Sequence, residues 1–186
     1  MRSLLAVSRG IDRLSSLVGH TTAWLAALMI FIGAANAILR YLSRDLGILV
    51  GGNAALEAQW YLFSLMFLLG AAWTLERDAH VRVDVLYGRL SPRNRTIVDL
   101  LGALLFLLPF CVFALTVSGP TVWNSWEVRE MSQDPGGLPR YPIKAVILVG
   151  FVLLGLQGIS EVIKSVARLV GQLPFPGDST AEEDTP

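Results

Sequence analysis

The sequence predicts an all-α integral membrane protein with four transmembrane helices, preceded by an N-terminal amphipathic interfacial helix. Hydrophobic residues make up 53% of the 186 positions, and the mean hydropathy is +0.55. Each of four apolar stretches can cross a hydrocarbon core of about 30 Å as a helix, and none has a charged residue near its middle. The stretches are Thr21–Leu39, Leu56–Leu75, Thr96–Val117 and Pro142–Ile163. A soluble domain of this length would not need them.

Residues 1–19 are expected to form the interfacial helix. On a helical wheel, basic residues fall on one side and apolar residues on the other. The two sets are Arg2, Arg9 and Arg13, and Leu4, Val7, Ile11, Leu14 and Val18. Such a helix would lie in the headgroup region with its basic face outward. The alternative is a cytosolic extension of the first transmembrane helix.

The first apolar stretch also resembles a signal peptide, because Ala35-Asn36-Ala37 has the form of a cleavage site. The polar segment before the stretch is long for a signal peptide, however, at about 20 residues. The apolar run also continues beyond that site, through Leu39. We therefore expect the first helix to be retained.

Residues 20–170 are expected to form the transmembrane domain, and turn-forming residues divide it into helices. The expected helices are at about 21–40, 54–77, 92–118 and 142–168. Ser91 followed by Pro92 is an N-cap with proline at the first helical position. The pair Gly119 and Pro120 predicts the end of the third helix, and Pro109 predicts a kink inside it. Residues 171–186 are rich in proline, glycine and acidic residues, which predicts a disordered acidic tail.

The distribution of basic residues predicts the orientation in the membrane. With four crossings, both termini and the 77–95 segment share one side, which holds ten of the fifteen lysines and arginines. These ten are Arg2, Arg9, Arg13, Arg77, Arg82, Arg89, Arg93, Arg95, Lys164 and Arg168. Because basic residues concentrate on the cytoplasmic side, we expect both termini in the cytoplasm. The five tryptophans lie near expected helix ends or in the long outer loop, as interfacial anchors do.

The ionisable groups within the apolar stretches lie near the ends of the stretches. With this orientation, Glu57 and Lys144 are near the outer boundary, and Asp99 and Glu161 are near the inner one. A carboxylate this close to hydrocarbon needs a partner. We hypothesise that Glu57 pairs with Lys144 across helices, or with a basic group on another subunit; the alternative is that Glu57 reaches up to the headgroups. Glu161 and Lys164 are three residues apart, which predicts a local ion pair.

The outer segment between the third and fourth helices combines two tryptophans with charges of both signs. Such a mixture suits a contact surface for a soluble partner, and the alternative is interfacial anchoring alone. The candidate docking residues are Trp123, Trp126, Glu127, Arg129, Glu130 and Arg140.

Several functional classes are disfavoured. A net charge of zero argues against a nucleic-acid partner, and the lone Cys111 allows no intrachain disulfide. Both histidines, His20 and His80, lie on the expected cytoplasmic side, so they cannot hold a haem within the bundle. His80 has no further ligand at metal-binding spacing, and there is no glycine-rich phosphate loop. We therefore expect no enzyme activity, metal or cofactor in this chain.

Several short motifs follow one another along the expected helices. In order they are Glu57-Ala-Gln-Trp60, Leu69-Gly-Ala-Ala72, His80-Val-Arg-Val-Asp84, Gly137-Leu-Pro139, Pro142-Ile-Lys144 and Gly155-Leu-Gln157. Together they resemble the motifs of the DctQ-like family, the small membrane subunits of tripartite ATP-independent periplasmic (TRAP) transporters. The resemblance spans most of residues 20–165, and its specificity comes from the order of these motifs across the expected helices. The matching positions with expected roles in packing or subunit contact are Glu57, Trp60, His80, Arg82, Asp84 and Lys144.

The resemblance implies a multi-pass scaffold in a bacterial inner membrane, bound to a much larger membrane subunit. In that family the large subunit holds the substrate and sodium sites and moves by an elevator mechanism. A periplasmic binding protein delivers an organic acid and docks on the outer face of both subunits. The 134–144 segment resembles members associated with uptake of 2-oxo acids or related carboxylates. The alternative function is a self-contained small transporter or channel acting as an oligomer, which would need charges at membrane depth and broken helices that this chain lacks.

Overall fold

The computed structural model describes residues 2–46, 53–80 and 87–175, and these residues are almost entirely helical. The elements are α1 (Arg2–Leu46), α2 (Asn53–Glu76), α4 (Pro92–Gly102), a π-helical turn η1 (Ala103–Leu107), α5 (Leu108–Glu127) and α6 (Tyr141–Leu169). Helices α4, η1 and α5 are consecutive and form one apolar run from Pro92 to Glu127. The all-α class is thus confirmed, with four helical runs long and apolar enough to cross a membrane.

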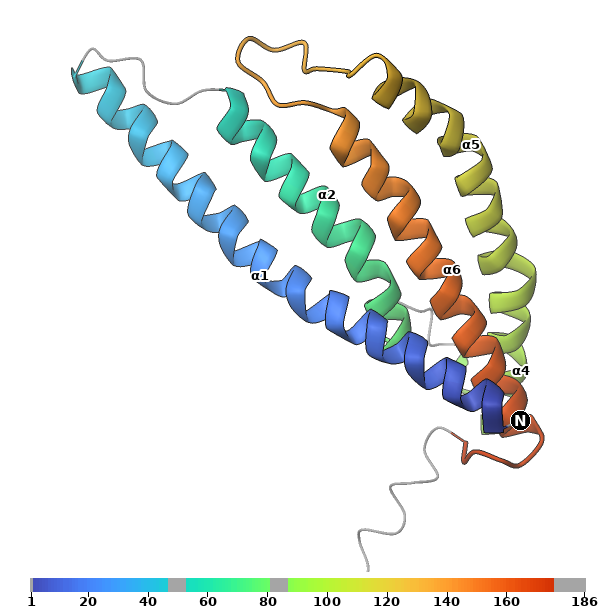
Figure 1. The fold of residues 1–186 in the computed structure, drawn as a ribbon. Helices are drawn as coiled ribbons and strands as arrows, with labels where there is room; N and C mark the ends of the chain where they lie inside the picture. Colours follow the sequence, from blue (N-terminus) through green and yellow to red (C-terminus); the bar gives the residue numbers. More distant parts are fainter. Residues whose placement is uncertain (1, 47–52, 81–86, 176–186) are drawn as a thin grey trace, which may run out of the picture.

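The helices lie side by side in the order α1, α2, α6, α5 (Figure 1). Helix α6 is the central element, because it packs against α1, α2, α4, η1 and α5. The start of α1 and the end of α6 lie at the same end of this layer, which we call the terminal end (Figure 1). The connection between α5 and α6 lies at the opposite end, which we call the loop end.

The expectation of a separate interfacial helix is wrong, because α1 runs without interruption from Arg2 to Leu46. The helical-wheel interpretation overlooked a third set of side chains. Ser8, Asp12 and Ser15 are spaced along one face of α1, and this face packs against α6. Leu4 and Val7 are exposed instead. The first turns of α1 are therefore held as part of the bundle by a polar face, and they continue the first transmembrane helix.

The third helical run does not end at Gly119 and Pro120, as the sequence suggested, but continues to Glu127. Proline removes one backbone donor, and here it lies inside a helix that is otherwise intact. The actual end is a Schellman motif: the amide of Glu130 donates to the carbonyl of Ser125, and that of Arg129 to Trp126. Arg129 takes the left-handed conformation, with φ of 47°, in the position where glycine is usual. The end of this helix could therefore not be predicted from the residue types.

The irregularity expected at Pro109 appears one turn earlier. The π-helical turn covers Ala103–Leu107, directly before Pro109. A proline ring clashes with the carbonyl four residues before it, here that of Leu105, and a wider turn relieves this clash. The run from α4 to α5 curves along its length (Figure 1).

The buried apolar side chains are mostly small. They are Ala72, Ala103, Cys111, Ala114, Val122 and Ala167, whereas large ones such as Phe67 and Phe106 are exposed. Lipid chains are as apolar as leucine, so helices in a membrane associate through close packing of small residues. Gly150 illustrates this, because a Cβ there would come within 3.0 Å of the backbone oxygen of Leu68. Cys111 lies in such a contact with α6, opposite Gly155.

Replacing Gly19 by alanine should destabilise the fold, because a Cβ at this position would overlap the ring of Trp73 on α2. Overpacking of this kind costs about 1–3 kcal/mol. Thermal unfolding of the detergent-solubilised protein, followed by circular dichroism, measures the effect. The matched control is Gly10→Ala in the same helix, where a Cβ meets nothing within 4 Å. Equal melting temperatures for the two variants would contradict the contact.

A clamped loop as a candidate docking surface

The connection between α5 and α6, residues 128–140, folds back on itself at the loop end. Met131 and Pro139 form an antiparallel bridge, and the amide of Ser132 donates to the carbonyl of Leu138 at 3.1 Å. Gly136 has a φ of 72°, which places it in the left-handed region that glycine adopts readily. We call residues 128–140 the outer-end loop. It has its own internal hydrogen bonds, so its surface has a defined shape.

Glu57, in the second turn of α2, binds the outer-end loop through hydrogen bonds to its carboxylate. Its side chain is buried, with 4% of the residue exposed. One carboxylate oxygen accepts a hydrogen bond from the hydroxyl of Ser132, and the other accepts one from the amide of Leu138 at 2.5 Å. A Cβ at Gly137 would lie 2.8 Å from the same carboxylate, so this position needs glycine. Tyr61, one turn further along α2, donates to the carbonyl of Pro139 at 3.2 Å.

Glu130 forms a second clamp between the ends of α5 and α6. Its carboxylate accepts hydrogen bonds from the ammonium of Lys144 and from the hydroxyl of Ser125. The hydrogen bond from Lys144 is the main reason that the pKa of Glu130 is lowered, and the bond from Ser125 lowers it further. Glu130 therefore stays ionised in its position between the two helices.

The hypothesis that Glu57 pairs with Lys144 is wrong. Lys144 pairs with Glu130, and Glu57 is satisfied by a hydroxyl and a backbone amide of the outer-end loop. Glu57 does not reach the headgroups either, because it is buried. The physical reason is that the loop folds over the start of α2 and brings polar donors to Glu57. Their position depends on the loop conformation, which residue spacing alone does not reveal.

Some of the candidate docking residues also make contacts within the chain. Trp126 is partly exposed and packs edge-on against Tyr141, with ring centroids 4.8 Å apart, and so fixes the end of α5 on the start of α6. Arg140 donates its amide to the carbonyl of Glu130 at 2.8 Å. Trp123, Glu127 and Arg129 are exposed, and 75% of Trp123 is accessible. These last three are available to a partner.

The remaining candidates do not form one site with the outer-end loop. Trp60 is exposed on α2, whereas His80 is exposed beyond the end of α2, toward the terminal end. Arg82 and Asp84 lie outside the described residues. The predicted acidic tail lies largely outside them too, since the described chain ends at Phe175.

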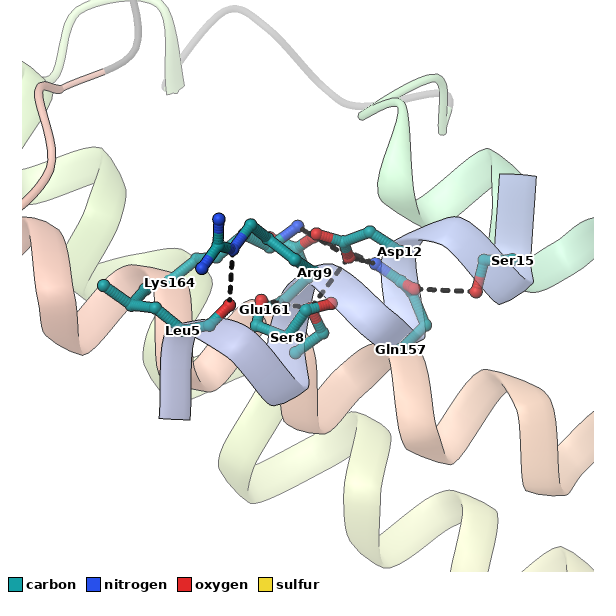
Figure 2. Close-up of polar contacts among 9 residues, drawn as sticks. Leu5, Ser8, Arg9, Asp12, Ser15, Gln157, Glu161 and Lys164 are labelled. Atoms are coloured by element: carbon teal, nitrogen blue, oxygen red, sulfur yellow. Dashed lines mark hydrogen bonds and ion pairs between the residues drawn. The ribbon is translucent and has the colours of Figure 1, made fainter. Parts of the chain in front are cut away.

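A polar network at the terminal end was missed by sequence reasoning. The carboxylate of Asp12 accepts hydrogen bonds from Gln157 at 2.9 Å and Ser160 at 2.8 Å, and it pairs with Lys164 at 3.2 Å (Figure 2). Ser15 donates to the side-chain oxygen of Gln157 at 2.7 Å (Figure 2). The signal was present as two matching polar stripes, one on α1 and one on α6, but nothing in the sequence shows that they face each other.

The expected ion pair between Glu161 and Lys164, also at this end, is confirmed at 2.5 Å. Polar contacts thus hold each end of the bundle. Within the described residues, the middle of each apolar span contains no charged residue. This arrangement positions helices and a loop.

A family model described as tripartite ATP-independent periplasmic transporters, DctQ component, matches residues 29–168. The chain belongs to this DctQ family. The suspected resemblance is confirmed, and the protein is a multi-pass membrane component of a transporter family, not an enzyme. The matched range contains the outer-end loop and Gln157, but it begins after Asp12, so the α1 half of the terminal network lies outside it.

The chain also resembles a curated DctQ protein. It is 35% identical over 104 residues to the C4-dicarboxylate TRAP transporter small permease protein DctQ of Vibrio cholerae serotype O1. The alignment covers 56% of this chain and 40% of that relative, so the chain spans less than half of the relative's length. No solved structure matches the chain.

Replacing Glu57 by glutamine should loosen the outer-end loop, because glutamine is uncharged and has one acceptor oxygen, so the amide of Leu138 and the hydroxyl of Ser132 can no longer each donate to their own carboxylate oxygen. Losing a buried charge-assisted hydrogen bond costs about 1–3 kcal/mol, so exchange of the loop amides should accelerate by about ten- to a hundredfold. Hydrogen–deuterium exchange of peptides covering residues 128–140 measures this. Glu127→Gln, at an exposed position, is the control. Identical exchange rates in the two variants would show that the Glu57 carboxylate does not hold the outer-end loop in place.

Proposed function

We propose that this chain is the small scaffold subunit of a TRAP transporter that imports an organic acid. In this proposal a large sodium-coupled elevator subunit carries the substrate, and a periplasmic binding protein delivers it. The observation that carries the proposal is the placement of charge in a DctQ-family chain. The carboxylates of Glu57, which is buried, and Asp12, which is half-buried, are engaged in structural contacts at the two ends of the bundle. A chain that moved an ion or acid itself would need polar groups at membrane depth.

The proposed scaffold role is supported by the shape of the bundle. The helices form an open layer with small buried residues and large exposed apolar ones. A much larger subunit can pack against such a layer while the polar contacts at both ends hold the helices in register. Among the positions that match the family motifs, Glu57 and Lys144 clamp the loop. Trp60 and His80 are exposed, and we assign them to subunit contact.

The proposed location is the bacterial inner membrane, with both termini in the cytoplasm. The terminal end carries most of the lysines and arginines, which supports this orientation. The outer-end loop then faces the periplasm, and its Arg129 is proposed to contact the binding protein together with Trp123 and Glu127 at the end of α5.

The proposed substrate class is a small carboxylate. The relative from Vibrio cholerae is named for C4-dicarboxylates, which supports that class. The resemblance of the 134–144 segment to members for 2-oxo acids supports the same broader class. Both are organic acids, and the substrate sites are proposed to lie in the large subunit.

The function is tested by reconstitution in liposomes with a large TRAP membrane subunit and a periplasmic binding protein from the same organism. We expect the two membrane chains to co-purify in detergent, and uptake of a radiolabelled dicarboxylate under an inward sodium gradient should require all three proteins. The isolated chain should give uptake at the level of empty liposomes. Solute transport by the isolated chain would refute the scaffold role and favour the alternative of a self-contained small transporter.

The docking surface is tested by Trp123→Ala combined with Arg129→Glu. These changes should weaken binding of the periplasmic protein by about tenfold or more, because truncating an exposed aromatic anchor at an interface often costs over 1 kcal/mol. Surface plasmon resonance with the reconstituted membrane complex measures the affinity. Trp24→Ala is the matched control, since Trp24 is equally exposed, at 78%, but lies on α1 away from the loop. Equal affinities in the two variants would exclude this surface.

A further inference from the structure

A cavity of about 680 Å³ lies at the terminal end, between the end of α2, the run α4–η1 and α6. Its size is within the range of small-molecule pockets in proteins. One part of its lining is charged and includes Glu76, Arg95, Lys164 and Arg168. Another part is apolar and includes Val98 and Leu107. The cavity is separate from the outer-end loop, which lies at the opposite end of the bundle.

Most charged groups of this lining have partners within the described residues. Lys164 pairs with Asp12 and Glu161. Arg95 donates to the carbonyls of Leu90 at 3.0 Å and Gly88 at 2.7 Å. These contacts within the chain therefore account for the charges of Lys164 and Arg95, and they hold the walls of the cavity together.

Two groups of opposite charge differ from the rest. Within the described residues, the carboxylate of Glu76 accepts no hydrogen bond, and its Oε2 atom is shielded from solvent. Arg168 is half-buried, and within the described residues its guanidinium forms no hydrogen bond or ion pair. Its position in the last turn of α6 favours a positive charge, but this leaves its guanidinium donors unused. The cavity thus presents one unmatched anion and one unmatched cation beside an apolar wall.

We propose that this cavity binds a phospholipid whose head group carries both a primary ammonium and a phosphate. The ammonium supplies the donors that Glu76 lacks, and the phosphate accepts from the guanidinium of Arg168, a pairing that is geometrically favourable. The start of an acyl chain covers Val98 and Leu107. The inference is independent of the transport function and does not require the partner subunits.

Other ligand classes leave part of the lining unmatched. A phospholipid with a glycerol head group has no cation for Glu76. A choline head group is cationic, but its quaternary nitrogen has no N–H to donate. A soluble zwitterion without acyl chains would leave the apolar wall uncovered. The proposal therefore predicts that a phospholipid with an ethanolamine head group binds more tightly than one with a choline or glycerol head group.

The test is a titration of the delipidated full-length protein, followed by native mass spectrometry. Phosphatidylethanolamine, phosphatidylcholine and phosphatidylglycerol with identical acyl chains are the probes. We expect phosphatidylethanolamine to bind about tenfold more tightly than the other two, as one additional charge-assisted hydrogen bond would allow. Glycerophosphoethanolamine, which has the same head group without acyl chains, should compete weakly. Strong competition would show that the cavity binds a soluble zwitterion, and it would overturn the proposal that a phospholipid binds there.

Variants assign the preference to the cavity. Glu76→Gln should abolish the preference for ethanolamine over choline, and Arg168→Gln should weaken binding of all three lipids. Glu127→Gln and Arg129→Gln, at the loop end, are charge-matched controls and should bind as the wild type does. Circular dichroism confirms the helix content of each variant. Equal binding of all head groups to the wild type, or a preference that survives Glu76→Gln, would overturn the proposal.

Discussion

Polar groups buried in a membrane protein have to be satisfied by the protein itself, because the hydrocarbon core offers neither donors nor acceptors. The consequences are visible at both ends of this helical layer. At one end Glu57 accepts hydrogen bonds from a hydroxyl and a backbone amide of the outer-end loop. At the other end Asp12 accepts hydrogen bonds from Gln157 and Ser160 of α6 and pairs with Lys164. Losing either carboxylate leaves its donors unmatched. Helix register, loop shape and the placement of α1 all depend on these two groups.

This constraint also accounts for the small core. Apolar burial gives little drive for association between helices in lipid, so the helices approach through alanine and glycine, and specificity comes from polar contacts near the boundaries. The result is a layer whose broad apolar surfaces are available to lipid or to a larger partner. The scaffold role that we propose for this DctQ-family chain would use such a surface, together with the outer-end loop for the proposed soluble partner.

Sequence reasoning succeeded where a property depends on one segment. Each apolar span is set by its own residues, and the Ser91–Pro92 start of α4 is set by local capping, which the structure contains. It failed at Gly119 and Pro120, because a helix supported by packing along its length tolerates residues that usually end helices. It also failed for residues 1–19, where wheel positions identified charged and apolar sides but could not show that the serines and Asp12 would meet α6.

The candidate site shows the same division. The sequence by itself determined the class of protein, the number of spans, the family and the residue types at the outer end, because these depend on composition, local period and motif order. Only the tertiary structure decided that Glu130, and not Glu57, takes Lys144, and that Trp126 supports the loop while Trp123 is free for contact. The reason is physical: a hydrogen-bond partner is chosen by distance and direction in space, and residues 57 and 132 come together only when the loop folds over α2.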